Sequence, residues 1–198
     1  MARYTGPKCR KCRALGISVC GSAKCALLRR QKPPGIHPPP RRVSDYKRLL
    51  IEKQRLRHTY WLTEKQFAHY AAEAKRQPGV AGKNLLQLLE SRLDAIVYRT
   101  GWAPTLPAAR QLVVHGHISV NGHTADRPSF QLKPGDRLSV NEKSRKVPSI
   151  AELAANPLAL PVPYLQRDTF EARLVTKPEA DQIPVEIQEN LIIEYYAQ

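Results

Sequence analysis

The 198-residue chain contains no long hydrophobic run, and its first third contains almost no acidic residues. A membrane-spanning helix needs roughly 20 consecutive apolar residues, and no segment of this sequence approaches that length. The first residues also lack the apolar core of a secretory signal peptide. Met1 is the only methionine, so the chain has no methionine cluster. We therefore expect a cytoplasmic protein that has no membrane association.

The sequence also lacks the motifs of the common enzyme classes. It contains no Walker loop and no Gly-x-Gly-x-x-Gly fingerprint, which are the usual glycine-rich sites for nucleotide phosphates. It contains no Ser/His/Asp constellation on a recognisable scaffold either. These absences favour a structural or binding protein over an enzyme.

What the chain has in excess is positive charge. Lys and Arg number 32 against 17 acidic residues, which gives a formal net charge of +15. Residues 1–60 contain 16 basic and two acidic residues, whereas residues 147–198 contain three basic and eight acidic ones. A chain this basic usually binds a polyanion. Because the cations lie between prolines and cysteines instead of along one face of an amphipathic helix, we favour nucleic acid over an anionic membrane.

Turn residues and hydrophobic periodicity divide the chain into four segments. Residues 1–43 form a basic, cysteine-containing arm that we expect to be irregular and extended, because five prolines occur within residues 33–40. Residues 44–91 form a helical lobe, residues 92–152 form an inserted small α/β module, and residues 153–198 return to the helical lobe. The predicted fold class is therefore α+β.

Capping residues and apolar spacing predict three helices in the helical lobe. Ser44 is a good N-cap for the first helix, and Thr63 with Gln66 makes a capping box for the second. An apolar stripe over residues 85–97 predicts the third helix.

The hydrophobic period changes in the module. Thr105 begins a short helix that extends to His115, and Asn121-Gly122 is a strong hairpin signal. A further turn leads into a strand over residues 137–141. The apolar run at residues 191–196 predicts a closing strand near the end of the chain.

Four cysteines within seventeen residues form the candidate metal site. They are Cys9, Cys12, Cys20 and Cys25, and the Cys-x2-Cys pair can bring two thiolates to one tetrahedral zinc ion. His37 is an alternative ligand. The arm has almost no apolar residues to form a core, so a metal would supply its folding energy. Disulfides, unliganded thiols and an iron–sulfur cluster are the alternatives that the spacing leaves open.

The basic residues of the arm and of the following helix are candidates for contact with RNA phosphates. Arginine outnumbers lysine in this region, and the guanidinium group suits bidentate contact with phosphate. The alternative is a solvated tail whose charge only provides solubility. We expect RNA contact from these residues: Arg3, Lys8, Arg10, Lys11, Arg13, Arg29, Arg30, Arg41, Arg42, Lys47, Arg48, Lys53, Arg55 and Arg57.

The stretch of residues 110–122 is the most specific one in the chain. It predicts a short helix, a glycine stop, a strand and a tight hairpin, and such a unit can hold a helix end and a hairpin against an RNA backbone. In the module we expect RNA contact from Arg110, His115, His117, Asn121 and Lys133. A second metal site at His115, His117 and His123 is the alternative, but these residues have no carboxylate partner at ligand spacing.

Particular stretches of the chain resemble a known family. The RNA-binding module of the small-subunit ribosomal protein four family is closely similar to these stretches: Glu90-Ser-Arg-Leu-Asp94, Val97-Tyr-Arg99, Ala109-Arg-Gln-Leu-Val113, His115-Gly-His117, Val120-Asn-Gly122, Pro128-Ser-Phe130 and Pro134-Gly-Asp136. The rest of that family is similar to these: Arg3-Tyr4, Gly6-Pro7, Pro33-Pro34-Gly35, Ser44-Asp45-Tyr46, Glu52-Lys53-Gln54, Lys65-Gln66-Phe67 and Glu194-Tyr195-Tyr196. The resemblance extends over nearly the whole chain.

The resemblance implies a function, a location and partners. Members of the family are structural proteins of the 30S subunit that bind the 5′ domain of 16S rRNA directly, nucleate assembly of the subunit body and contribute to translational accuracy. They lie near the side where messenger RNA enters, and they contact small-subunit proteins five and twelve instead of forming homo-oligomers. Some members bind zinc through an amino-terminal cysteine cluster, which the four cysteines here resemble.

Two enzyme families that share the module are the closest rivals. Pseudouridine synthases use the aspartate of an Arg-Leu-Asp stretch, and Arg92-Leu93-Asp94 is present here. That stretch lies inside a leucine-rich helical segment, however, and the chain has no room for a catalytic domain of that kind. Nothing resembles the nucleotide-binding motifs of tyrosyl-tRNA synthetases. A zinc-finger DNA regulator is also disfavoured, because the cysteine spacing does not match a two-cysteine, two-histidine finger.

Overall fold

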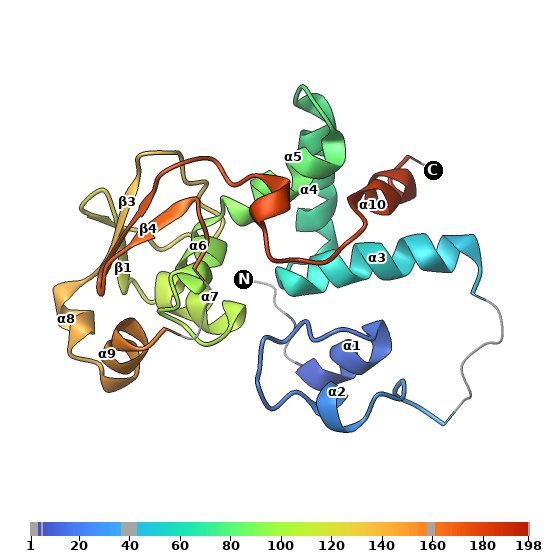
Figure 1. Cartoon of the computed structure of the whole chain (residues 1–198), viewed down its shortest axis with the longest axis horizontal. Coiled ribbons are helices and arrows are strands. Elements are labelled where there is room, and N and C mark those ends of the chain that lie inside the picture. The colour runs from blue at the N-terminus through green and yellow to red at the C-terminus, as the bar shows by residue number, and fades with distance from the viewer. Residues whose placement is uncertain (1–3, 5, 37–42, 158–160, 198) are drawn as a thin grey trace. The chain divides into compact units, whose positions relative to one another are not determined.

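The computed structural model describes residues 4, 6–36, 43–157 and 161–197, and these form two compact units (Figure 1). Unit 1 contains residues 1–85 and 185–198, and unit 2 contains residues 86–184. The structure therefore combines a mostly helical unit with a unit that contains a small sheet, as the predicted α+β class requires. Within the described residues, no helix is both long and apolar enough to cross a membrane.

The arm in unit 1 is more regular than we predicted. It contains helix α1 (Lys8–Leu15) and the single turn α2 (Ala26–Arg29). Helix α1 follows Pro7 and contains neither proline nor glycine, and it ends at Gly16, whose φ of 72° is the left-handed conformation that glycine adopts easily. The prediction of an irregular arm was therefore wrong for this segment, because the prolines that prevent helix formation all lie outside α1.

Two long helices in unit 1 begin at the predicted caps. The Ser44 side chain accepts a hydrogen bond from the Lys47 backbone at the start of α3 (Asp45–Thr59). Thr63 and Gln66 form the predicted capping box at the start of α4 (Glu64–Arg76). Both caps are confirmed, since each pairs backbone N–H groups that the first turn of a helix leaves without partners.

The end of the chain is a helix, so our prediction of a strand at residues 191–196 was wrong. Helix α10 (Glu189–Tyr195) packs on α3 within unit 1, as Figure 1 shows. Ile192 is fully buried, and the Tyr196 ring lies 6.1 Å from the Phe67 ring of α4. Ile192 and Tyr196 are four residues apart and therefore lie on the same face of a helix. The short apolar run alone could not show whether the segment is a helix or a strand.

The predicted third helix is divided into α5 (Ala81–Glu90) and α6 (Leu93–Arg99). The break occurs because the segment of residues 128–132 takes over the backbone hydrogen bonds there. The Leu93 N–H donates to the Phe130 carbonyl at 2.8 Å, and the Leu132 N–H donates to the Ser91 carbonyl at 2.8 Å. The prediction of one continuous helix over residues 85–97 was therefore wrong.

Unit 2 contains an antiparallel five-stranded sheet with the order β2-β1-β3-β5-β4. The strands are β1 (Ile118–Val120), β2 (His123–Thr124), β3 (Arg137–Val140), β4 (Leu165–Arg167) and β5 (Glu171–Leu174). The predicted hairpin joins β1 to β2, and both turn residues have positive φ, 51° at Asn121 and 84° at Gly122. This is the geometry that an Asn-Gly turn favours.

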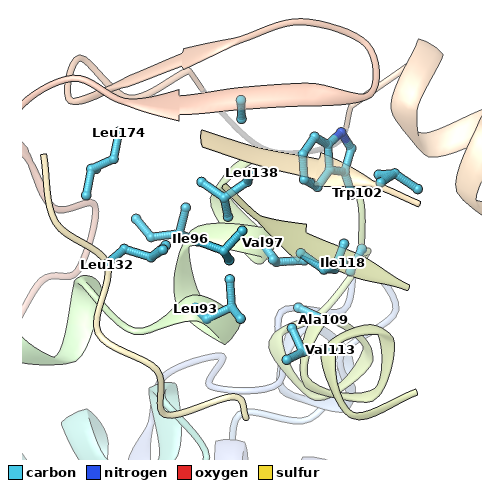
Figure 2. Packing of buried hydrophobic residues seen from close by; sticks show 14 of the residues in the cluster. Leu93, Ile96, Val97, Trp102, Ala109, Val113, Ile118, Leu132, Leu138 and Leu174 are labelled. Atoms are coloured by element: carbon cyan, nitrogen blue, oxygen red, sulfur yellow. The ribbon is translucent and has the colours of Figure 1, made fainter. Parts of the chain in front are cut away.

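Helices α6 and α7 (Leu106–Val114) pack with the sheet around one hydrophobic core (Figure 2). Thr105 caps α7 as predicted, accepting a hydrogen bond from the Ala108 backbone. Figure 2 shows Leu93, Ile96 and Val97 of α6 pointing toward Leu138 of the sheet. The helices α8 (Glu142–Arg145) and α9 (Pro148–Ala155) follow β3.

The segment of residues 153–198 does not return to the helical unit as a whole. Strands β4 and β5 join the sheet of unit 2 through pairing of β5 with β3. The 3-10 turn η1 (Ala180–Gln182) also belongs to unit 2, and only residues 185–198 belong to unit 1. The reason is that β3 has an open edge, and β5 supplies the hydrogen-bond partners that this edge needs.

Candidate functional site

The four cysteines gather at the two short helices of the arm. Cys9 and Cys12 lie on α1, Cys20 lies in the following loop, and Cys25 precedes α2. The sulfur atoms of Cys9, Cys20 and Cys25 all lie within 4.8 Å of one another, and all four cysteines are free thiols. Four thiolates around a zinc ion at about 2.3 Å would lie roughly 3.8 Å apart, so this cluster is close to the required geometry.

Hydrogen bonds lower the pKa of the Cys25 thiol. Burial raises the pKa of the Cys25 thiol, but hydrogen bonds from the Leu27 backbone, Ser18 and the neighbouring thiols outweigh this effect and lower it to about 7. Cys12 is the opposite case, because burial and its contacts with Cys20 and Cys25 raise its pKa to about 12. A metal ion would have to displace the Cys12 proton, as metals commonly do at thiol ligands.

Two hydrogen bonds between residues distant in the sequence attach the arm to helix α3 and to the turn after it. The Trp61 indole Nε1 donates to the Val19 carbonyl at 3.2 Å, and the Arg55 Nε donates to the Leu15 carbonyl at 3.1 Å. Trp61 has a φ of 51°, an unfavourable conformation for a bulky residue. Such a conformation persists only where surrounding contacts hold it.

Four cations of the arm line one open cavity of about 740 Å³. They are Arg13, Arg29, Arg30 and Lys32, and the other lining residues are Gln31, Pro33 and Gly35. The Arg13 side chain donates to the Lys32 and Pro33 carbonyls, at 2.9 and 3.2 Å, and so fixes the loop that carries the other cations. With no acidic group in its lining, the cavity fits an anion such as a phosphate.

Several predicted contact residues on α3 are already engaged within the protein. The Lys53 side chain is only 3% exposed, and its Nζ donates to Glu64 Oε1 at 2.7 Å. Arg57 lies 3.3 Å from the same carboxylate, and Arg55 pairs with Glu52. These three cations form ion pairs with carboxylates of unit 1. In contrast, Lys8, Arg10 and Arg48 are exposed, and Lys11 and Lys47 are partly exposed.

In unit 2, the predicted residues also divide into engaged and exposed ones. Arg110 donates two hydrogen bonds to Asp94 Oδ2, at 2.9 and 2.6 Å, and Asn121 of the hairpin turn bonds Asp136 and the Arg137 backbone at the start of β3. His115 and Lys133 are exposed, and the half-buried His117 bonds Ser144 through Nδ1 at 2.8 Å. The structure does not bring these residues together with the cysteines in one unit. Four candidate residues lie outside the described residues: Arg3, His37, Arg41 and Arg42.

Comparison with known proteins agrees with this arrangement. Residues 3–90 match the family described as "Ribosomal protein S4/S9 N-terminal domain", and residues 91–138 match "S4 domain". The small ribosomal subunit protein uS4 of Thermoanaerobacter sp. (strain X514) is 46% identical over 209 aligned residues, which cover the whole of both chains. The proteins of the same name from Geobacter sp. (strain M21) and Rubrobacter xylanophilus are each 44% identical, again over the whole of both chains. The chain belongs to the uS4 family.

Membership of the uS4 family decides between the enzyme and non-enzyme readings. The relatives are named as small ribosomal subunit proteins, and none of these names describes an enzyme. The aspartate of the Arg-Leu-Asp stretch has a structural role in this uS4 chain, because Asp94 is fully buried and binds both Arg92 and Arg110.

Sequence reasoning missed one cation of the uS4 arm. Lys32 lines the cationic cavity together with three predicted arginines. The signal was present in the sequence, because Lys32 lies between Arg29-Arg30 and the proline segment. The neighbouring arginine pair is the more obvious signal for phosphate contact, so the single lysine beside it was overlooked.

The histidine at the end of α3 gives this uS4 chain a predicted sensitivity to acid. Burial, with the nearby charges of Arg57 and Lys11, lowers the pKa of His58 to about 4. An unfolded histidine has a pKa of about 6.5, so between these values the unfolded chain binds a proton that the folded chain excludes. The free energy of unfolding should therefore fall as the pH drops, by about 2 kcal/mol between pH 7 and pH 5.

Urea denaturation followed by circular dichroism at the two pH values measures this loss. The variant His58→Gln should lose about 2 kcal/mol less than the wild type over the same interval, because glutamine does not titrate. Comparing the two proteins removes the contribution of all other titrating groups. Equal losses in both would show that His58 does not exclude the proton.

Proposed function

We propose that this chain is a structural constituent of the small ribosomal subunit that binds 16S rRNA, with the cationic surface of the arm as its principal contact. The observation that carries the proposal is the cavity lined by Arg13, Arg29, Arg30 and Lys32. Among the described residues, the lining of this cavity contains four cations and no carboxylate, which suits phosphates that lie close together in folded RNA. Because the chain belongs to the uS4 family, we infer that this polyanion is 16S rRNA.

We propose a narrower contact surface than the sequence alone suggested. The candidates are these exposed and partly exposed cations of the arm and of the start of α3: Lys8, Arg10, Lys11, Arg13, Arg29, Arg30, Lys32, Lys47 and Arg48. In unit 2 the candidates are His115, His117 and Lys133. Lys53, Arg55, Arg57 and Arg110 serve mainly to hold the protein in shape, because each is bound to a carboxylate.

Finer aspects of the proposal come from the resemblance to the family. We infer that the chain binds the 5′ domain of 16S rRNA early, helps nucleate the body of the 30S subunit and contributes to translational accuracy. We also infer that it contacts small-subunit proteins five and twelve and lies near the entering messenger RNA. In mechanism this is scaffolding, since phosphate contacts fix position without reading the base sequence.

We further propose that the arm holds one structural zinc ion. Cys9, Cys12, Cys20 and Cys25 would hold the ion, and zinc would supply the folding energy that the few apolar residues of the arm cannot. The support is that three sulfurs already lie within 4.8 Å of one another and the fourth is buried beside them. The same donors would also accept an iron–sulfur cluster, which metal analysis distinguishes.

Removing two arginines of the cavity tests the RNA contact. The double variant Arg29→Ala/Arg30→Ala should bind a 16S 5′-domain transcript more weakly, and the slope of log affinity against log salt should fall by about 0.7–0.9 for each phosphate that is no longer neutralised. Filter binding over a range of salt concentrations measures both quantities. The double variant Arg173→Ala/Lys177→Ala removes the same charge from exposed positions of unit 2. If both variants changed the slope equally, the cavity would be no more than a part of the general positive charge.

A further inference from the structure

The cysteine cluster and the cationic cavity share the two short helices of the arm. The cationic cavity is the one lined by Arg13, Arg29, Arg30 and Lys32. Cys12 and Arg13 are neighbours on α1. Cys25 immediately precedes α2, which ends at Arg29. The elements that position the thiols therefore also position the cations.

Contacts of sulfur atoms join α1 to α2, and no residue of α2 is buried. The Ala26 backbone N–H at the start of α2 donates to Cys9 Sγ of α1 at 3.5 Å. The sulfurs of Cys9, Cys20 and Cys25 lie within 4.8 Å of one another. An ion held by these sulfurs would fix the two helices against each other, and with them the cations that each helix carries.

Arg13 links α1 to the loop that follows α2. Its Nε donates to the Lys32 carbonyl at 2.9 Å, and its Nη2 donates to the Pro33 carbonyl at 3.2 Å. The planar guanidinium group presents both donors in a fixed fork, which the single ammonium group of a lysine does not reproduce. The position of α1 therefore determines where Lys32 lies in the cavity.

The cations of the cavity repel one another when no anion is present. Residues 1–44 contain no aspartate and no glutamate, so no carboxylate of the arm offsets this repulsion. A phosphate in the cavity neutralises the cations and so favours the arrangement of α1, α2 and the loop in which the cysteines lie together. The arrangement that suits the anion is thus the one that suits the metal.

We propose that metal binding at the four cysteines and phosphate binding in the cationic cavity are cooperative, with Arg13 as the positioning residue that couples them. The inference rests on the proposed function and on the proposed zinc site, because it describes how the metal regulates the RNA contact. Each ligand stabilises the folded arm, so the second ligand to bind no longer has to order it. A chain without metal is therefore the weaker RNA binder, and bound RNA retains the metal.

A titration with Co²⁺ measures the coupling. Metal-free, reduced, full-length protein is titrated with Co²⁺ alone and with a saturating amount of the 16S 5′-domain transcript, in Mg²⁺ and physiological salt. Tetrahedral complexes of Co²⁺ with thiolates absorb visible light, so Co²⁺ that binds the RNA is not counted. We expect the transcript to raise the affinity for Co²⁺ about tenfold, which lies within the usual range of coupling between two sites.

The reciprocal measurement needs no variant either. Filter binding should show that the Co²⁺-loaded protein binds the transcript more tightly than the metal-free protein, by the same factor that the titration gives. Equality of the two factors is a thermodynamic requirement of coupling between two binding sites. The proposal can therefore be tested on the wild type alone if a variant of the arm does not fold.

Arg13→Lys separates the position of the cation from its charge. The variant keeps the positive charge and all four cysteines, so it should bind Co²⁺ with the wild-type absorption spectrum. It removes the guanidinium fork, so most of the gain in Co²⁺ affinity on RNA binding should be lost. Arg76→Lys is the matched control, because Arg76 is an exposed residue of α4 and does not line the cavity. This control should keep the whole gain.

Four outcomes would overturn the proposal. Equal Co²⁺ affinity of the wild type with and without bound transcript would exclude the coupling, although the proposed function would stand. A gain in Arg13→Lys as large as that of the wild type would show that charge alone acts and that the fork does not. If the wild type bound no Co²⁺ through thiolates, the metal site would fail. If it showed no preference for the transcript over an unrelated folded RNA, the proposed function would fail, and the coupling would fail with it.

Discussion

Replacement of Cys25 by serine is expected to abolish zinc binding and to unfold the start of the arm. Purified wild-type protein should contain close to one zinc ion per chain, because four thiolates within a short segment form a closed structural site. Zinc supplies about 10–16 kcal/mol to small zinc-folded peptides, and the arm has little core to replace it. Cys25 has a lowered pKa of about 7, so it supplies a thiolate near neutral pH.

Metal analysis and limited trypsin digestion measure this effect. Cys25→Ser should retain much less than one zinc per chain, and its arm should be cleaved rapidly at the basic residues of α1. Ser22→Ala is the control in the same loop, since the Ser22 hydroxyl accepts only a bond from the Lys24 backbone among the described contacts. Wild-type protein that contained neither zinc nor iron would exclude the metal site. Iron in place of zinc would indicate a cluster instead.

Replacement of Asp94 by alanine is expected to destabilise unit 2 strongly. The Asp94 carboxylate is buried and accepts bonds from Arg92 Nε and Nη2, at 3.0 and 2.9 Å, and from Arg110. Removing it takes away the carboxylate that the buried Arg92 and the mostly buried Arg110 both bind. Breaking a buried ion pair in this way typically costs about 3–5 kcal/mol.

Chemical denaturation of the full chain, followed by a probe in unit 2, measures the cost. Fluorescence of Trp102 reports on unit 2, provided that Trp61 of unit 1 is replaced by phenylalanine in both proteins compared. Asp45→Ala is the control, because Asp45 belongs to an exposed pair with Arg48 on α3. The variant of Asp94 should unfold unit 2 at a much lower denaturant concentration than the control. A small shift, like that of the control, would mean that the two arginines find other partners or water.

The features that could be predicted from sequence depend on residues close together in the chain. The caps at Ser44 and Thr63 and the turn at Asn121-Gly122 were predicted correctly, because each depends on contacts within a few residues. The four cysteines fall in the same category, since a segment of seventeen residues can hardly avoid bringing them near one another.

The features that could not be predicted depend on partners distant in sequence. The break between α5 and α6 requires backbone bonds from residues 128–132, and β5 joins β3 across a long separation. The terminal helix is stabilised by contacts with α3 and α4, including a Lys53 ammonium 4.5 Å from the Tyr195 ring. Local pattern could not choose between helix and strand without these neighbours.

The candidate RNA surface shows the same limit. From sequence, Lys53 and Arg110 look like any other cation of a basic protein. Their carboxylate partners Glu64 and Asp94 lie 11 and 16 residues away, and only the fold brings each pair together. Charge in a sequence therefore indicates that a polyanion is bound, but burial decides which cations are available to bind it.

We propose that the cationic arm and the two units together hold ribosomal RNA in a defined shape. The most direct measurement is the affinity of the full-length, metal-loaded protein for a 16S 5′-domain transcript and for an unrelated folded RNA of equal length, in Mg²⁺ and about 0.15 M monovalent salt. We predict binding to the ribosomal transcript that is tighter by roughly a thousandfold, the low end of specificity ratios for nucleic-acid-binding proteins. Equal affinity for the two RNAs would contradict the account, because it would reduce the arm to a nonspecific positive charge.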